Sequence, residues 1–244
     1  MDCRTAPVGS STLAVGVCGS PSPWPDDSFE PIASFVRLQQ HRHMSCSWNY
    51  QIDRLTSKIA RNAEALERPF IVAIDGKSGS GKSTLADFMA QKLDCSVISG
   101  DDFFSGGETV SRLPPENLAQ LCIDWKSQRR VLESLRRSEP AQFFPYDWDA
   151  FDGSKRSTPM CVGVSRVAIF EGVYSARPEL RDLVDLRVLI EIPEDERHQR
   201  LLRREGQIGE WEMQWHRAED WYFETAAPRS AFEVVLSETM PFSL

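Results

Sequence analysis

The stretch FIVAIDGKSGSGKSTLADF, residues 70–88, decides how this chain folds. Its first five residues, 70–74, are continuously apolar, which predicts a buried strand. Residues 76–83 then match the pattern G-x-x-x-x-G-K-[S/T], and residues 83–93 carry the apolar spacing of a helix. The order strand, glycine-rich loop, helix is the structural context that this pattern requires.

Such a loop is suited to holding phosphate groups. The backbone N–H groups of residues 77–83 can turn inward around an anion, while the following helix presents its positive end to the same anion. We expect Lys82 to reach the β and γ phosphates of ATP and the Ser83 hydroxyl to hold Mg²⁺. A bare glycine-rich turn is the alternative interpretation. The predicted nucleotide-binding residues are Gly76, Ser78, Gly79, Ser80, Gly81, Lys82, Ser83 and Thr84.

The rest of the pattern predicts an α/β fold. Unbroken apolar strands alternate with amphipathic helices, which is typical of a parallel sheet covered on both faces. We therefore expect a three-layer sandwich around a mainly parallel five-stranded sheet. The further predicted strands are residues 96–99, 167–170, 186–192 and 232–236, and the predicted helices are residues 48–66, 83–93, 126–137, 194–205 and 208–225.

Acidic residues follow two of the predicted strands. Asp101 and Asp102 come after the strand at 96–99, and Glu171 comes directly after the strand at 167–170. Ligands of open parallel sheets bind beyond the carboxyl ends of the strands. We assign Asp101 as a catalytic base, with Asp102 as the alternative, and Glu171 as an anchor for magnesium or substrate. A helix cap or turn residue is the competing interpretation of each acid.

Two features of the predicted carboxyl-terminal helices have open interpretations. Arginines cluster at residues 197–204, and Arg200 and Arg204 are the candidates for a catalytic lid that closes over the phosphates. Alternatively, these arginines form a solvated face paired with the acids at 194–196. In the helix at 208–225, Trp211 and Trp215 lie on one apolar stripe, which we interpret as core packing rather than as a stacking platform for a base.

Composition limits the classes of function. The chain has 244 residues, 41% of them apolar, and a net charge of −8. No basic block of the nucleic-acid-binding kind and no apolar run of membrane-spanning length stands out, so we expect a cytoplasmic protein with a small-molecule partner; a homo-oligomer is compatible with these features. Residues 1–45, rich in Ser, Pro and Gly, predict a disordered extension before one folded domain, residues 46–244.

With these residues in hand, the chain resembles the uridine kinase-like family of P-loop kinases over about residues 68–237. The resemblance depends on GKSGSGKST at 76–84, SGDDFF at 99–104, PYDWD at 145–149 and IFEGVYS at 169–175. It implies an ATP- and Mg²⁺-dependent transfer of phosphate to a hydroxyl of a nucleoside, with Asp101 as the base. It further implies an acceptor pocket that contains Asp124, Tyr146 and Asp147.

The chain departs from the family pattern in its acceptor half. Phe104 stands where the family has Tyr, and the segment AFDGSKR, residues 150–156, lacks the His of uridine kinases. A vitamin or sugar acceptor therefore stays open, because a pocket without a hydrogen-bonding partner discriminates less. The FSGGE stretch at 104–108 resembles a transporter signature, but its place behind a strand indicates a glycine turn. A nucleotide-dependent switch is a further alternative, although the base-reading motif of guanine switches is missing.

Overall fold

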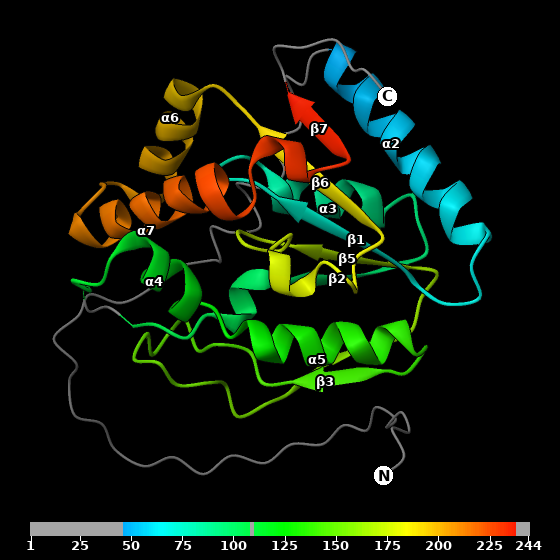
Figure 1. Ribbon diagram of the computed structural model, residues 1–244, viewed down its shortest axis with the longest axis horizontal. Coiled ribbons are helices and arrows are strands. Elements are labelled where there is room, and N and C mark those ends of the chain that lie inside the picture. Colours follow the sequence, from blue (N-terminus) through cyan, green and yellow to red (C-terminus); the bar gives the residue numbers. More distant parts are fainter. Residues whose placement is uncertain (1–45, 108–109, 238–244) are drawn as a thin grey trace, which may run out of the picture. The chain divides into compact units, whose positions relative to one another are not determined.

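The computed structural model describes residues 46–107 and 110–237. The predicted disordered extension, residues 1–45, lies outside the described residues. Within them a five-stranded sheet forms the central layer and helices cover both of its faces (Figure 1). Among the helices of this part of the chain, none combines the length and apolar character that crossing a bilayer requires.

The elements alternate along the chain as the sequence predicts. The strands are β1 (Phe70–Asp75), β2 (Cys95–Ser99), β3 (Ala141–Phe143), β4 (Met160–Val162), β5 (Val167–Glu171), β6 (Leu186–Glu191) and β7 (Val234–Ser237). The α-helices are α2 (Cys46–Glu64), α3 (Lys82–Ala90), α4 (Pro115–Leu121), α5 (Trp125–Arg136), α6 (Glu194–Glu205) and α7 (Glu210–Trp221). Short helical turns are η2 (Gly100–Phe103), η3 (Pro178–Leu180), η4 (Tyr222–Ala226) and η5 (Arg229–Ala231).

The five long strands pair in the order β2-β5-β1-β6-β7, and every pairing is parallel. The register brings the carboxyl ends of three neighbouring strands level, because Glu171 of β5 pairs with Ile74 of β1 on one side and with Ser99 of β2 on the other. The loop after β1 and the acids after β2 and β5 therefore share one edge. This confirms the predicted fold class and explains why residues far apart in sequence meet there.

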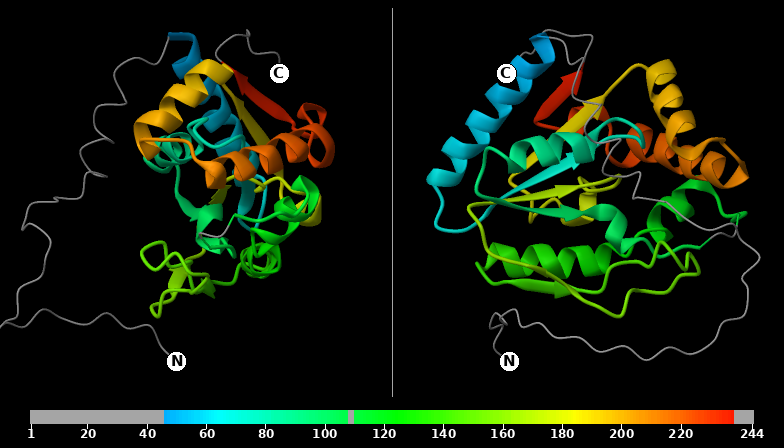
Figure 2. Two further views of the ribbon diagram at one scale, coloured as in Figure 1. Left: turned by 90° about the vertical axis from the view of Figure 1, so that its left-hand side faces the viewer. Right: turned by 180° about the vertical axis from the view of Figure 1, so that it is seen from behind.

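Alternate residues of the central strands enter two separate cores, which is why the strands are apolar throughout. Val72 and Ile74 of β1 pack with α2 and α3, whereas Ile71 packs on the opposite face with α5 and α7. β5 divides in the same way. The two layers of helices are visible on opposite sides of the sheet in Figure 2.

The sequence pattern does not predict helix α4 or the strands β3 and β4, which pair in a two-stranded ribbon. Helix α4 has seven residues and each of the two strands has three, so these elements are too short to show a period. The helix expected at 208–225 is α7 followed by the single π-helical turn η4.

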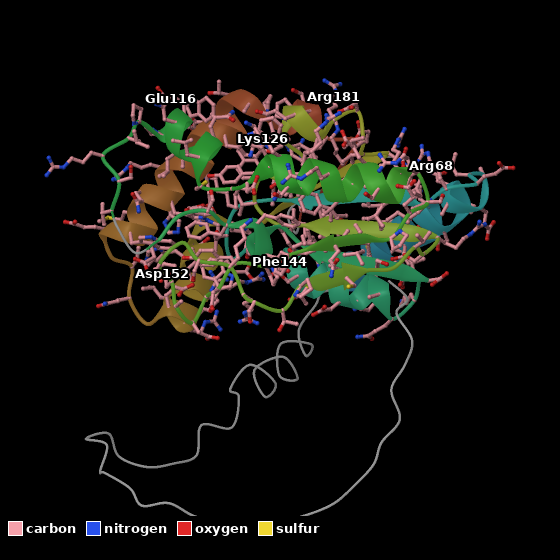
Figure 3. The ribbon with its side chains drawn as sticks, turned by 90° about the horizontal axis from the view of Figure 1, so that it is seen from below. Arg68, Glu116, Lys126, Phe144, Asp152 and Arg181 are labelled. Atoms are coloured by element: carbon pink, nitrogen blue, oxygen red, sulfur yellow. The ribbon has the colours of Figure 1, made fainter. Side chains whose placement is uncertain are left out.

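Phe144, just after β3, lies on the outer surface with 50% of its area exposed (Figure 3).

Candidate active site

The loop after β1 has the conformation of a phosphate cradle. Gly76 and Gly81 have φ angles of 147° and 100°, and Gly81 is the residue from which α3 begins. A Cβ on Gly76 would lie 2.5 Å from the carbonyl oxygen of Ile190, so only glycine fits there. The glycine pattern is thus explained by backbone shape and by the close approach of β6.

Lys82 is buried and folded across the loop. Its Nζ donates to the carbonyl oxygens of Gly76, at 2.9 Å, and Lys77, at 3.2 Å. Ser80, in contrast, is turned inward, with its hydroxyl buried and without a hydrogen-bond partner among the described residues. Of these two predicted nucleotide-binding side chains, Lys82 is thus hydrogen-bonded to the backbone of the loop, whereas the Ser80 hydroxyl points into the protein.

Ser83 at the start of α3 and Glu171 at the end of β5 lie in hydrogen-bond contact. The Ser83 hydroxyl donates to Oε1 of Glu171 at 3.2 Å. Burial, and after it the charge of Asp101, raises the pKa of Glu171 to about 7, against the opposing effect of the Lys82 ammonium. A buried carboxyl of this kind, beside a hydroxyl and a second acid, is an oxygen-rich setting that a cation would stabilise.

The oxygens of Ser83 and Glu171 suit a magnesium ion held partly by a nucleotide, rather than a metal ion whose ligands all come from the protein. Within residues 46–107 and 110–237, no group of three or more His, Cys, Asp or Glu side chains gathers into a metal centre. Mg²⁺ in nucleotide sites is held by one or two protein oxygens together with phosphate oxygens and water. Ser83 and Glu171, whose oxygens lie 3.2 Å apart, could provide that number of protein ligands.

The two acids of η2 have different surroundings. Asp101 is exposed and borders a cavity at this edge of the sheet. Asp102 is half-buried, and burial, followed by the charge of Asp101, raises its pKa. Its carbonyl oxygen accepts a hydrogen bond of 2.7 Å from the backbone N–H of Tyr146. The cavity is therefore open to Asp101, the residue assigned as the base, rather than to Asp102.

Five aromatic side chains line this cavity of about 630 Å³: Phe104, Trp148, Phe151, Trp211 and Trp215. The rings contact one another, with Phe104 stacked on Trp148 at 5.2 Å between centroids and Trp211 stacked on Trp215 at 6.2 Å. Trp211 and Trp215 of α7 are partly buried and pack against the core, as the apolar stripe predicts. They also form a wall of the cavity, which the sequence did not predict.

The arginines of α6 divide into separate roles. Arg197 is buried, paired with Glu194, and donates to the carbonyl oxygen of Ser78 at 3.2 Å. Arg200 pairs with Glu196, and its Nη1 lies 3.5 Å from where a Cβ on Gly81 would be. Arg204 is largely exposed at the rim of the cavity and pairs with Glu205 at 2.6 Å. Arg200 therefore has the partner that the alternative interpretation expects, whereas Arg204 pairs outside residues 194–196. The lid role of these two arginines stays a prediction.

The acceptor residues implied by the family resemblance lie off the cavity lining. Asp124 caps the start of α5, accepting from the Ser127 N–H at 3.0 Å, and Tyr146 is fully buried behind Phe104. Oδ1 of Asp147 accepts from two backbone N–H groups of its own turn. The cavity wall is formed instead by aromatic side chains that flank these positions.

Two buried acids at the loop were not predicted. The Asp75 carboxylate, fully buried, accepts four hydrogen bonds: Oδ1 from Gly76 N at 2.8 Å and Tyr174 N at 3.0 Å, and Oδ2 from Ala176 N at 2.9 Å and the Tyr222 hydroxyl at 2.8 Å. Burial raises its pKa to about 6, although these donors act in the opposite direction. The sequence does offer one signal for Asp75, because this residue is an acid at the end of an apolar strand.

The second acid, Glu219 of α7, contacts Ser78 of the loop. Its Oε1 accepts from the Ser78 N–H at 3.1 Å. The predicted nucleotide-binding residue Ser78 therefore donates its N–H to a protein carboxylate. A helical Glu among other helical acids gave no signal in the sequence.

Comparison with known proteins gives sequence relatives and fold neighbours. No family model matches the chain. It is 26% identical over 157 residues to the uridine/cytidine kinase UKL1, chloroplastic, of Arabidopsis thaliana, covering 62% of this chain and 32% of that protein. It is 26% identical over 147 residues to a uridine kinase of Deinococcus deserti, covering 57% and 70% of the two chains. This chain thus spans about a third of the length of its first Arabidopsis relatives.

Two solved structures share the fold. One is described as a possible uridine kinase from Bacillus stearothermophilus, with a TM-score of 0.53 and 24% identity over 75% of this chain and 99% of that one. The other is the D-glycerate 3-kinase from Cryptococcus neoformans var. grubii, with a TM-score of 0.52 and 16% identity over 80% and 96% of the two chains. These likenesses concern the α/β fold of P-loop kinases.

Proposed function

We propose that this chain, which its sequence similarity identifies as a member of the uridine kinase-like P-loop kinases, is an ATP- and magnesium-dependent kinase whose acceptor is a nucleoside. One observation carries the proposal. The loop that would hold the terminal phosphates, the Ser83–Glu171 pair and Asp101 lie at one edge of the sheet, and Asp101 borders an aromatic cavity on that edge.

The transfer would proceed by in-line displacement. The acceptor hydroxyl oxygen forms a bond to the γ phosphorus, the bond from that phosphorus to the β–γ bridging oxygen breaks, and ADP leaves with the electron pair. Asp101 takes the proton of the attacking hydroxyl. Lys82 and the loop N–H groups bind and orient the phosphates, with Arg200 adding positive charge beside Gly81.

Ser83 and Glu171 would hold the magnesium ion, which supplies charge neutralisation at the β and γ phosphates when bound. Deprotonated Glu171 is required for that role, so ion binding competes with a proton on this carboxyl. Burial, and after it the charge of Asp101, raises the pKa of Glu171. Asp101 itself borders the cavity in which the acceptor would bind.

The aromatic wall supports a planar acceptor. A nucleobase can stack on an exposed ring such as Trp148, and base–aromatic stacking is worth ~1–3 kcal/mol per base. A small polyol or hydroxy acid offers no flat surface to five rings. The curated relatives named uridine kinases point to the same class of acceptor.

Measuring ADP release with acceptors added one at a time tests this function. We expect uridine or cytidine to raise ADP release well above the acceptor-free rate, and Lys82→Ala to abolish it. D-Glycerate and fructose serve as acceptors without a planar aromatic ring to stack. Acceleration only by these two would contradict the nucleoside assignment, and protein that neither binds MgATP nor releases ADP with any of the four would contradict the kinase assignment.

A further inference from the structure

Glu219 lies between the phosphate loop and the aromatic cavity. Its side chain has no solvent exposure, and a single oxygen, Oε1, accepts three hydrogen bonds. Two donors belong to Ser78, the N–H at 3.1 Å and the hydroxyl at 2.5 Å, and the third is Nε1 of Trp215 at 2.6 Å. One carboxylate oxygen therefore joins the loop to a ring of the cavity wall.

Ser78 is fixed at each of its polar groups. Its carbonyl oxygen accepts from Nη1 of Arg197, at 3.2 Å, while its N–H and hydroxyl both point at Glu219. The same Nη1 lies 3.8 Å from Oε2 of Glu219, an oxygen that is buried and without a hydrogen bond among the described residues. Charged groups shielded from water in this way interact more strongly than exposed pairs do.

Trp215 completes the connection on the cavity side. Its indole N–H also lies 3.1 Å from the Ser78 hydroxyl, and its ring is stacked parallel to Trp211 at the cavity surface. A ligand that displaces this ring must therefore disturb hydrogen bonds that fix Ser78. Conversely, a nucleotide that shifts Ser78 must disturb the indole.

We propose that Glu219 is a positioning residue that fixes the phosphate loop through Ser78 and couples nucleotide binding to the aromatic wall through Trp215. The proposal rests on the proposed function, because it concerns the same nucleotide site. Coupling of this kind is reciprocal: whatever acceptor binding does to nucleotide affinity, nucleotide binding does to acceptor affinity.

The neighbouring acid of the same helix provides a contrast. Asp220 pairs with Lys77 of the loop at 2.5 Å, but half of its side chain is exposed. Exposed ion pairs contribute little. The connection between loop and cavity is therefore carried by Glu219, although two acids of α7 touch the loop.

MgATP alone, titrated into the full chain, tests the proposal. Its affinity is measured by calorimetry. Tryptophan emission is recorded in the same titration, and the response of Trp215 is the emission change of the wild type minus that of Trp215→Phe. We expect Glu219→Gln to weaken MgATP binding about tenfold, on the scale of one charge-assisted hydrogen bond, and to lose the Trp215 response. Ser78→Ala should also weaken MgATP binding. The double variant Glu219→Gln, Ser78→Ala should bind MgATP no more than twofold more weakly than Glu219→Gln alone. Glu210→Gln, an exposed acid on α7, is the matched control and should behave as wild type.

Wild-type affinity with a retained Trp215 response in Glu219→Gln would overturn the proposal, as would additive losses in the double variant. If Glu219→Gln does not fold, Ser78→Ala decides alone, because it removes only a hydroxyl; an unchanged affinity and response there overturns the proposal. Failure of the proposed function is distinguishable, since the wild-type chain itself would then not bind MgATP.

Discussion

The phosphate half and the acceptor half of the candidate site are built from different kinds of segment. The phosphate half consists of residues at or beyond the carboxyl ends of three neighbouring parallel strands whose register is level: Lys82, Ser83, Glu171 and Asp101. The cavity wall comes mainly from Phe104 after η2, the turn around residues 148–151, and helices α6 and α7, and Ser78 of the phosphate loop also borders it. The first half is fixed by strand pairing and directed hydrogen bonds, whereas the second is formed by ring contacts between separate segments.

This difference indicates where specificity can change. Hydrogen bonds at the strand ends, such as the four to Asp75, demand particular atoms at particular distances. Contacts between rings at 5–6 Å depend on shape and area, so one ring can replace another. Chemistry should therefore be sensitive to substitutions in the phosphate half, while the acceptor half should mainly set affinity for the acceptor.

Among the substitutions that compare the two halves, the largest expected effect is at Asp101. Asp101→Asn should lower kcat by about 10²–10⁴, or about 3–5 kcal/mol in the barrier, because the acceptor proton loses its base. MgATP affinity should stay near the wild-type value. Steady-state kinetics with the best acceptor measures this, with Asp102→Asn as the matched control. An equal or larger loss in Asp102→Asn would move the role of base to the half-buried acid.

Glu171 should make the stability of the nucleotide-free protein depend on pH. Its folded pKa of about 7 lies above the ordinary value of 4.5, so this group contributes stability that is complete below pH 4.5 and lost as the pH rises through 7. Glu171→Gln should remove that loss and be more stable than wild type at pH 8, by up to about 3 kcal/mol.

Urea unfolding without magnesium at pH 6 and pH 8 measures the difference between the two proteins. Asp75, whose pKa is raised to about 6, contributes in the same direction at lower pH and cancels in this difference. Addition of MgATP should stabilise wild type much more than the variant. A difference that does not change with pH would contradict the buried, partly protonated state of Glu171.

Trp148 should affect only the acceptor half. It is 41% exposed and stacked on Phe104, so Trp148→Ala removes stacking surface at little cost to folding. We expect the acceptor KM to rise about tenfold, or ~1–2 kcal/mol, with kcat and the ATP KM nearly unchanged. Phe144→Ala is the control, an exposed ring that lies off the cavity and should leave every constant unchanged. A fall in kcat instead would show that the ring orients the hydroxyl.

Sequence reasoning predicts the phosphate half because its chemistry is local or set by strand ends. The loop pattern at 76–84 includes the backbone shape that it needs, and an acid after an apolar strand must lie at the sheet edge. Asp101 and Glu171 were placed in this way, and the strand register explains why they meet. Asp75 is also an acid at the end of an apolar strand. Because it directly precedes the glycine pattern, the sequence did not indicate that its carboxylate holds the loop.

The acceptor half could not be predicted for a physical reason. Trp211 and Trp215 lie on an apolar stripe, and a stripe does not reveal which of its residues border a cavity. Glu219 is one acid among several on α7, and only the packing of that helix against the loop makes it a ligand of Ser78. Contacts between segments distant in sequence leave no period or spacing to detect.

Asp147 gives the smallest expected effect and the sharpest test of the family-based acceptor assignment. Its Oδ1 accepts two long hydrogen bonds, 3.1 and 3.3 Å, from N–H groups of an exposed turn, so Asp147→Ala should cost less than about 1 kcal/mol of stability. The acceptor KM should change less than threefold, because the side chain lies off the cavity. Asp152→Ala removes a comparable turn contact, 2.9 Å to the Ser154 N–H, and controls for loosening of the segment. A tenfold rise in acceptor KM for Asp147→Ala alone would return this carboxylate to the acceptor pocket, and would mean that the turn rearranges when the acceptor binds.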